Sequence, residues 1–128
     1  MSTEEIIRYY NNSRFVEHCG IKLTARADDR IEGCIEVMPM HLNGSGHLHG
    51  GLLFTLADTV GGANSRRYAD HITTLDSDFH FLTSNTTRFL YGNAELIRNG
   101  GKVLVLRIKI TDDTSEVFAE GTFTYYKL

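Results

Sequence analysis

The sequence lacks a long apolar run, a paired-cysteine motif and any excess of basic residues. No stretch approaches the eighteen or so apolar residues that a membrane-spanning helix needs. The N-terminal sequence MSTEEIIRYY is acidic and polar and does not resemble a signal peptide. The net charge is −3, whereas nucleic-acid-binding proteins normally carry a basic face. We therefore expect a cytoplasmic protein that binds neither a membrane nor nucleic acid.

Cysteine and proline are both scarce. The two cysteines, Cys19 and Cys34, lie far apart in the sequence and form no Cys-x-x-Cys pair. Reduced core thiols are therefore favoured, and a disulfide between them is the alternative. The single proline, Pro39, is expected to end a strand. The chain also has no repeats, low-complexity tracts or linker, and its length suffices for one core. We expect a single domain over residues 1–128.

Hydrophobic periodicity predicts the elements. Ser2 and Glu5 have the spacing of a capping box at the start of a first helix, and Ser13 is placed to cap a second. The expected helices cover 3–10, 14–18 and about 50–68. The expected strands cover 21–27, 31–37, 72–82, 86–98, 102–112 and 116–126.

Six strands and one long helix predict an α+β fold, in which an antiparallel sheet wraps around a single buried helix. The sheet has to curve strongly to cover an apolar cylinder. Gly33 and Gly92 are candidate positions for that curvature.

The stretch 41–63, HLNGSGHLHGGLLFTLADTVGGA, is the centre of this arrangement. Its first part is a loop rich in Gly and His, and its second part is an apolar helix that carries one carboxylate, Asp58. An apolar helix is normally buried, and an ionised carboxylate is costly to bury without partners. Asp58 is therefore a candidate catalytic group. The alternative places it on a solvated stripe beside Thr55 and Thr59.

Gly50 and Gly51 stand where the long helix begins. The first amides of a helix have no intrahelical partner, and the helix dipole adds partial positive charge there. Without side chains, these two residues would let a substrate carbonyl approach the amides, which could polarise it or hold an oxyanion. A tight turn is the competing explanation of the pair.

Distance limits how these groups can cooperate. At 1.5 Å per residue, Gly50 and Asp58 lie about 12 Å apart along one helix. This is too far for both to act on one carbonyl. If they act together, a second subunit must bring its Asp58 to the first subunit's Gly50, and a two-fold dimer is the minimum catalytic unit.

Other polar residues of the loop are ambiguous. Asn43 could donate to a substrate oxygen, but Asn before Gly is also ordinary turn chemistry. His49 could orient the substrate or hold the loop. His47 and His49 form a His-x-His pair, yet no third or fourth metal ligand stands at a recognisable spacing, so no metal is expected. His41 and the remaining histidines are treated as structural or surface residues.

Two pairs near the end of the long helix have simpler explanations. Gly61 and Gly62 each cost up to about 1 kcal/mol relative to Ala inside a helix. That cost is consistent with close packing of a strand or of another subunit's helix. Arg66 and Arg67 are expected to end the helix, where cations complement its dipole.

The stretch resembles a known family. Asn43, then His49-Gly50-Gly51, then Asp58 are similar to the pattern N-x5-HGG-x6-D of the PaaI-type thioesterases of the hot-dog superfamily. Residues 15–21, 73–82 and the closing strands also resemble that family, so the likeness covers nearly the whole chain.

The resemblance implies strand order 1-2-4-5-6-3, a dimer with a continuous sheet that often pairs into a tetramer, and hydrolysis of acyl-coenzyme A thioesters without a metal or bound cofactor. By position, the Gly50 amide would polarise the carbonyl with help from Asn43, and His49 would orient the substrate. Asp58 of the partner subunit would be general base or nucleophile, and Thr74 would help place the water.

Further contacts and departures also follow from the resemblance. Gly51 lies in the implied substrate-binding segment, and Arg88 and Lys102 are candidate contacts for the coenzyme's phosphates. The sequences 83–85 and 64–67 depart from the family pattern, which leaves the acyl group open. Two other functions remain, a non-catalytic module that binds acyl-CoA or another small ligand, and a hydratase or dehydratase of the same fold. The latter needs a catalytic His paired with an acid, which His49 and Asp58 match poorly.

Overall fold

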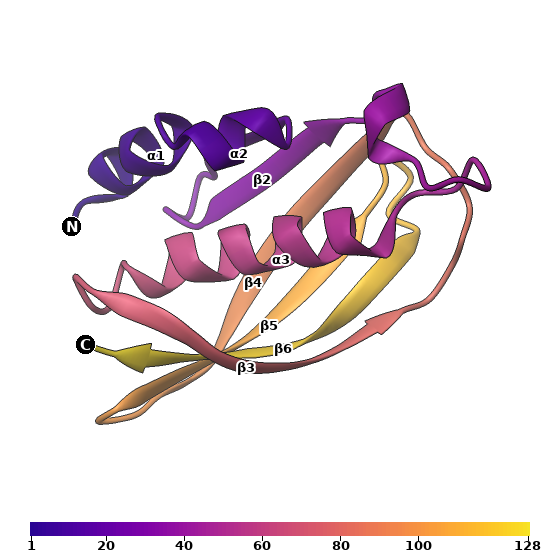
Figure 1. Cartoon of the computed structure of the whole chain (residues 1–128). Helices are drawn as coiled ribbons and strands as arrows, with labels where there is room; N and C mark the ends of the chain where they lie inside the picture. The colour runs from indigo at the N-terminus through magenta and orange to yellow at the C-terminus, as the bar shows by residue number, and fades with distance from the viewer.

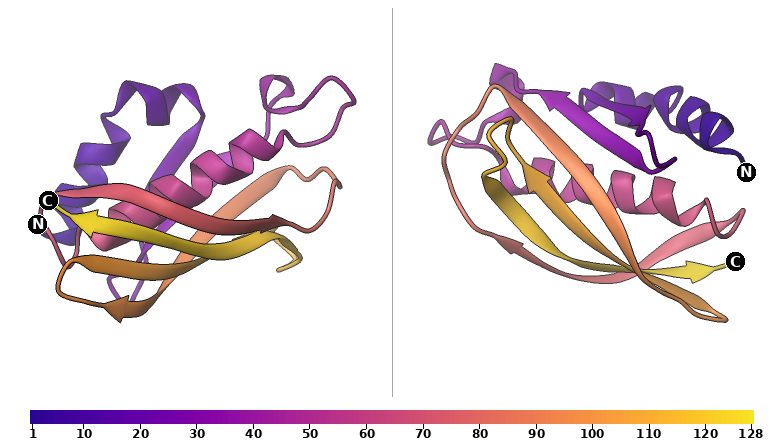
Figure 2. Two further views of the ribbon diagram at one scale, coloured as in Figure 1. Left: turned by 60° about the horizontal axis from the view of Figure 1, so that its bottom comes forward. Right: turned by 180° about the vertical axis from the view of Figure 1, so that it is seen from behind.

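In a computed structural model that describes residues 1–128, a six-stranded antiparallel sheet curves around one long helix (Figures 1 and 2). The elements in chain order are α1 (Thr3–Asn11), α2 (Arg14–His18), β1 (Ile21–Ala25), β2 (Ile31–Glu36), the 3-10 turn η1 (Pro39–His41), α3 (Gly50–Ser65), β3 (Ile72–Phe81), β4 (Phe89–Asn99), β5 (Val103–Thr111) and β6 (Val117–Lys127). The strand order is β1-β2-β4-β5-β6-β3. The predicted α+β fold and the expected strand order are both confirmed.

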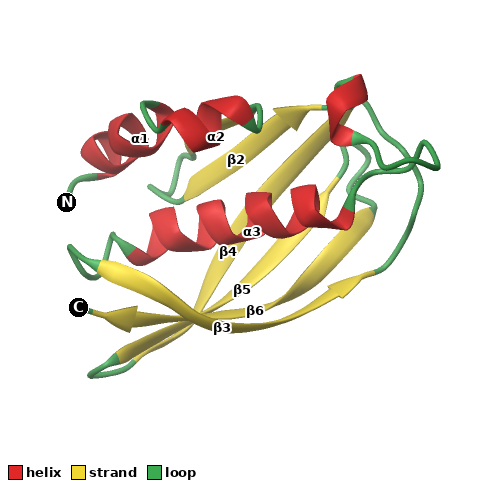
Figure 3. Ribbon diagram, in the orientation of Figure 1, coloured by secondary structure: helices red, strands yellow, loops and turns green.

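Two predicted bounds are wrong by three residues, and the others agree within two. Helix α3 ends at Ser65 rather than Tyr68, because the amides of Arg67 and Tyr68 bond to carbonyls three residues back instead of four. Strand β4 begins at Phe89 rather than Thr86, because the chain before it forms a connection outside the sheet (Figure 3). Arg66 is consequently the C-cap residue that ends the helix, and Arg67 follows it.

The predicted caps differ in outcome. The Ser2 side chain accepts the Glu5 amide at 3.2 Å and caps α1 as expected. Ser13 occupies the cap position of α2, but its side chain makes no capping hydrogen bond. Pro39 follows strand β2 and opens η1, a turn that the sequence pattern did not predict.

Helix α3 lies in the concave side of the sheet and is buried along most of its length (Figure 1). Leu53, Leu56, Ala57, Val60 and Ala63 join the core with apolar side chains of every strand but β3. Strand β5 alternates as predicted, with Leu104, Leu106, Ile108 and Ile110 buried and Arg107 and Lys109 exposed. None of the helices is both long and apolar enough to cross a membrane.

Two asparagines connect the helices to the first hairpin. The Asn11 side chain accepts the Leu23 amide at 2.9 Å and donates to the Leu23 carbonyl at 3.1 Å. Asn64, which is 2% exposed, makes the same paired bonds with Ile31 at 3.1 and 2.9 Å. A buried amide with all its polar atoms bonded costs little. The polar end of α3 therefore fixes the start of β2 and leaves no polar group of Asn64 unpaired.

Gly33 and Gly92 pair with each other across β2 and β4, beneath the middle of α3. A Cβ on Gly33 would lie 2.6 Å from Val60 Cγ2, and one on Gly92 would lie 3.0 Å from the same atom. These distances are shorter than van der Waals contact. Gly33 and Gly92 therefore let α3 approach the sheet closely. From the sequence, only curvature of the sheet was expected at these two positions.

Strand β3 forms one edge of the sheet and pairs only with β6. A bulge interrupts this pairing between Thr74 and Asp76, so Leu75 has no partner in β6. Leu75 and Phe81 are 56% and 53% exposed. The apolar residues that define the β3 pattern are thus largely uncovered in one chain.

The glycines inside α3 face two tyrosines. A Cβ on Gly61 would lie 2.1 Å from the Tyr125 hydroxyl, and one on Gly62 would lie 3.1 Å from the Tyr10 hydroxyl. Tyr125 belongs to the buried face of β6, whereas Tyr10 lies on α1. The close packing that the glycine pair indicated is therefore present, against one strand and one helix of the same chain.

The Gly61 contact predicts an unusual response to substitution. Alanine favours a helix over glycine by about 1 kcal/mol, but overpacking a core costs about 1–3 kcal/mol. We expect Gly61→Ala to lower the free energy of unfolding by about 1–2 kcal/mol in urea titrations. Gly62→Ala is the matched control and should cost less, because Tyr10 is only partly buried. A Gly61→Ala variant as stable as the wild type would contradict this packing.

Candidate active site

The loop before α3 folds back on itself. Leu42 and Leu48 form an isolated antiparallel bridge, and the Asn43 amide bonds to the His47 carbonyl at 2.7 Å. Leu48 is buried and anchors the loop to the core. The loop also contacts the β3–β4 connection, because His47 Nδ1 donates to the Ser84 carbonyl at 2.8 Å. The residues that lead into α3 are therefore held at both ends.

Asn43 uses half of its side chain for the turn. Its Oδ1 accepts the amides of Ser45 and His47 at 2.9 and 3.1 Å. Its side-chain nitrogen, Nδ2, makes no hydrogen bond within the chain, and the residue is exposed. The turn chemistry is present, and the Nδ2 donors stay available to another molecule.

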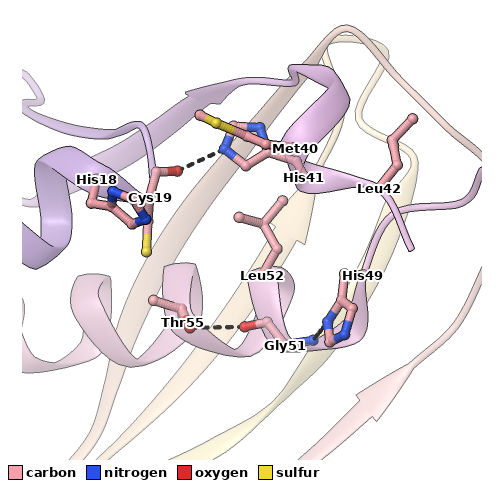
Figure 4. Close-up of a pocket in the computed structure, with 9 residues that line it drawn as sticks. All are labelled: His18, Cys19, Met40, His41, Leu42, His49, Gly51, Leu52 and Thr55. Carbon is pink, nitrogen blue, oxygen red and sulfur yellow. Dashed lines mark hydrogen bonds between the residues drawn. The ribbon is translucent and has the colours of Figure 1, made fainter. Parts of the chain in front are cut away.

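His49 is the N-cap of α3. Its Nδ1 accepts the Gly51 amide at 2.8 Å, so in the neutral ring the proton lies on Nε2 (Figure 4). The Gly51 amide is thereby satisfied. The Gly50 amide makes no hydrogen bond within the chain and remains the free donor at the positive end of the helix.

Asp58 is half-buried, two turns along α3, and two strands hold its carboxylate. Thr74 Oγ1 donates to Asp58 Oδ1 at 2.8 Å, and the Tyr125 hydroxyl donates to the same oxygen at 3.1 Å. Thr74 and Tyr125 are direct partners across β3 and β6. The second oxygen, Oδ2, makes no hydrogen bond within the chain.

Asp58 lines an open cavity together with Thr55 and Thr59, as the alternative explanation expects, but its carboxylate is also held by the sheet. The hydroxyls of Thr55 and Thr59 bond to helix carbonyls four residues back, at 2.8 and 2.7 Å. They are therefore occupied by the backbone of α3. The carboxylate turns to the sheet instead, where Thr74 and Tyr125 donate to it.

Two tyrosines near Asp58 are held in the neutral form. Burial raises the pKa of Tyr125 well above its usual range, and the adjacent Asp58 carboxylate raises it further. Burial also raises the pKa of Tyr10, while the Arg66 guanidinium, which donates to the Tyr10 hydroxyl at 3.1 Å, partly offsets this effect. Tyr125 is consequently a hydrogen-bond donor throughout the ordinary pH range.

Two cavities lie along the face of α3 that the sheet leaves open. A cavity of about 510 Å³ adjoins His49, Gly51 and Thr55 at the start of the helix (Figure 4). A second, of about 420 Å³, adjoins Thr55, Asp58 and Thr74. Half of the residues that line the second cavity are apolar, namely Tyr10, Phe15, Val16, Phe54 and Ile72. The start of α3 and the Asp58 carboxylate thus adjoin different cavities, both of which include Thr55.

The other histidines have structural roles or lie at the surface. His41 is 5% exposed, accepts the Met38 amide on Nδ1 at 2.9 Å and bonds to the Cys19 carbonyl through Nε2 at 2.9 Å. Cys19 and Cys34 are free thiols. No group of three or more His, Cys, Asp or Glu side chains is arranged to hold a metal ion.

Arg88 and Lys102 lie at opposite ends of β4. The Arg88 carbonyl accepts the Val37 amide beside the end of β2, whereas the Lys102 carbonyl accepts the Lys127 amide beside the C-terminus. A strand of this length spans about 35 Å at 3.3 Å per residue. The two cations therefore cannot contact one phosphate group within a single chain. The Arg88 guanidinium lies 3.4 Å from Glu36 and is mostly exposed.

Comparison with known proteins places the chain in a family. Residues 45–119 match the model of the thioesterase superfamily, and the chain belongs to this superfamily. The protein Rv1847 of Mycobacterium tuberculosis is 25% identical over 113 residues, which cover 84% of this chain and 81% of that protein.

Solved structures share the fold. The PaaI protein of the Escherichia coli phenylacetic acid degradation operon matches with a TM-score of 0.86 at 22% identity, over 94% of this chain and 88% of that one. The BH2602 protein of Bacillus halodurans, solved with CoA, matches with a TM-score of 0.83 at 23% identity, over 98% and 88%. The chain therefore has the hot-dog fold.

Sequence reasoning missed Tyr125 at this site. The residue lies in a strand whose alternation predicts only that it is buried, and nothing in the sequence gives the register that places it opposite Thr74. One signal was available. The unfavourable Gly61-Gly62 pair indicated a close neighbour next to Asp58, although not which residue.

The cap that His49 provides can be tested by stability. Replacing a capping residue with alanine costs about 0.5–2 kcal/mol. We expect this loss for His49→Ala in urea unfolding, because the Gly51 amide loses its acceptor. His49→Asn keeps an acceptor at the cap and should retain most of the stability. Equal stability of His49→Ala and the wild type would show that the cap contributes nothing.

Proposed function

We propose that the protein is an acyl-CoA thioesterase of the PaaI type, which hydrolyses a thioester to a free acid and coenzyme A. One observation carries this proposal. The Asp58 carboxylate is bonded through one oxygen only, beside a cavity that is half lined by apolar residues, on the same helix whose Gly50 amide has no partner. Membership of the thioesterase superfamily supports the reaction class.

Two observations support coenzyme A as the thiol part of the substrate: a relative was solved with CoA, and two cations of this chain could contact its phosphates. The BH2602 protein was solved with CoA, and this supports CoA as the thiol. Strand β4, which Arg88 precedes, starts at the end of the sheet where α3 begins, and the β4–β5 turn, which holds Lys102, lies at the opposite end (Figure 1). Both cations are proposed as phosphate contacts. If both act on one coenzyme, they must belong to different subunits, because β4 separates them within one chain.

The acyl group is proposed to enter the cavity next to Asp58. Its wall includes Tyr10, Phe15, Phe54 and Ile72, which suit an apolar acyl chain or ring. Phe15, Phe54 and Ile72 have no polar side-chain atoms, and Tyr10 has only its hydroxyl. The thioester carbonyl would then lie at the mouth of this cavity, with the CoA portion outside it.

Two subunits are proposed to form each site. Gly50 and Asp58 are eight residues apart on one helix, about 12 Å at 1.5 Å per residue. A second chain brings its Asp58 to the first chain's Gly50 if the helices meet about a two-fold axis. The uncovered apolar residues of edge strand β3, Leu75 and Phe81, are consistent with a partner chain there. A dimer is the minimum unit, and a tetramer is the proposed assembly.

The proposed chemistry follows from these positions. The Gly50 amide, the helix dipole and the free Asn43 amide group would stabilise charge on the thioester oxygen. His49 would orient the substrate through Nε2–H, and Gly51 would leave room for it. Asp58 of the partner subunit acts as general base for water or as nucleophile. As general base, Asp58 takes a proton from water, the water oxygen bonds to the carbonyl carbon, the C–S bond breaks, and CoA leaves as the thiol with that proton. As nucleophile, Asp58 itself forms the C–O bond while the C–S bond breaks. Water then hydrolyses the resulting anhydride to the free acid and regenerates the carboxylate, and the second proton of that water goes to the CoA thiolate.

Asp58→Asn tests the proposal. General acid–base catalysis typically contributes about 10²–10⁴-fold, so we expect kcat to fall by at least about a hundredfold on the best substrate of an acyl-CoA panel read by thiol release. Glu95→Gln, which removes an exposed carboxylate on β4, is the matched control and should retain activity.

Thermal unfolding of both variants should match the wild type. Wild-type turnover by Asp58→Asn would disprove the role of Asp58. Saturable acyl-CoA binding without thiol release across the panel would instead favour a non-catalytic module.

A further inference from the structure

Tyr125 reaches Asp58 from inside the core. The residue is 0% exposed, yet its hydroxyl lies 3.1 Å from Asp58 Oδ1 and 3.2 Å from the Asp58 carbonyl. A tyrosine hydroxyl has one proton to donate, and a carboxylate is the stronger acceptor of the two. The hydrogen bond to the carboxylate is therefore the dominant one.

The helix is built to admit this hydroxyl. A Cβ at Gly61 would lie 2.1 Å from the hydroxyl oxygen and 2.9 Å from ring carbon Cζ, so no other residue type fits without movement. Glycine inside a helix costs about 1 kcal/mol relative to alanine. Glycine at position 61 is therefore locally unfavourable for the helix, but it lets the Tyr125 hydroxyl reach the Asp58 carboxylate.

Tyr125 and Thr74 act on the carboxylate as a pair. They are direct partners across β6 and β3, and both donate to Oδ1. Two donors on one oxygen fix the side-chain rotation of Asp58 and leave Oδ2 free. Because the donors come from two paired strands, the sheet sets the direction of Oδ2 rather than the helix that carries it.

Tyr125 differs from Thr74 in its access to substrate. Thr74 lines the cavity beside Asp58, whereas Tyr125 does not. The Tyr125 hydroxyl therefore acts on a substrate only through Asp58. Because Tyr125 is fully buried, water does not compete with Asp58 for the proton of its hydroxyl.

We propose that Tyr125 is a positioning residue for thioester hydrolysis, which holds the Asp58 carboxylate so that Oδ2 acts on water or on the carbonyl. This inference rests on the proposed function. A misplacement of about 1 Å in a catalytic group can cost about a hundredfold in rate. The loss of one of two positioning bonds should therefore lower kcat and leave substrate binding nearly unchanged.

A double-mutant cycle tests the inference. Tyr125→Phe and Asp58→Asn are made singly and together, and kcat and KM are measured on the best thioester. We expect Tyr125→Phe to lower kcat by about ten- to a hundredfold with little change in KM. In the Asp58→Asn background it should cause no further loss, because the group it positions is already disabled.

Tyr126→Phe is the matched control, since Tyr126 is the adjacent tyrosine of β6 and its hydroxyl makes no hydrogen bond within the chain. It should retain the wild-type kcat. Partial unfolding of the Tyr125→Phe protein would lower kcat equally in both backgrounds, so the cycle separates positioning from a purely structural role.

The results of the cycle distinguish a failure of the Tyr125 positioning role from a failure of the proposed thioesterase function. If Asp58→Asn is impaired but Tyr125→Phe has the wild-type kcat, or if the two losses multiply, the positioning role is overturned and the proposed function stands. If Asp58→Asn turns over at the wild-type rate, both are overturned. An impaired Tyr125→Phe enzyme, with unchanged KM and no additional loss in the double variant, supports both.

Discussion

The rigid spacing of α3 is the constraint on which the account depends. A helix cannot bring together two groups eight residues apart, so Gly50 and Asp58 remain about 12 Å from each other in any conformation that keeps α3 intact. The start of the helix, with His49 and Gly51, and the Asp58 carboxylate adjoin separate cavities along the open face of the helix. Under the proposed function, one chain presents two half-sites, and the edge strand β3, with its exposed Leu75 and Phe81, is the proposed surface for a second chain.

The sheet gives each half-site its orientation. At the start of α3, a loop anchored by Leu48 delivers His49 to cap the Gly51 amide and leaves the Gly50 amide free. At Asp58, a cross-strand pair of hydroxyls fixes one carboxylate oxygen. The glycines that interrupt the helix and the sheet make this close approach possible. Packing in the core and chemistry at the site are therefore linked through the same few contacts.

Much of this architecture could be predicted from the sequence. The local hydrophobic pattern predicts the helices and strands and their approximate bounds. The loop and helix around Gly50 resemble a specific family, and this resemblance predicts the strand order. Contacts between distant segments were not accessible. Neither the Thr74–Tyr125 register nor the Gly33–Gly92 pair beneath α3 leaves a local signature. The capping bond of His49 was also missed, because histidine is an uncommon cap and its ring geometry depends on the loop.

Mixing two disabled variants tests the shared site most directly. Asp58→Asn keeps the Gly50 amide, and Gly50→Val obstructs the approach to that amide but keeps Asp58. Co-refolding equal amounts gives mixed dimers in about half of the population, each with one intact site, so about a quarter of the wild-type activity should return. Activity no higher than the average of the two separate variants would contradict the account, because each site would then lie within one chain.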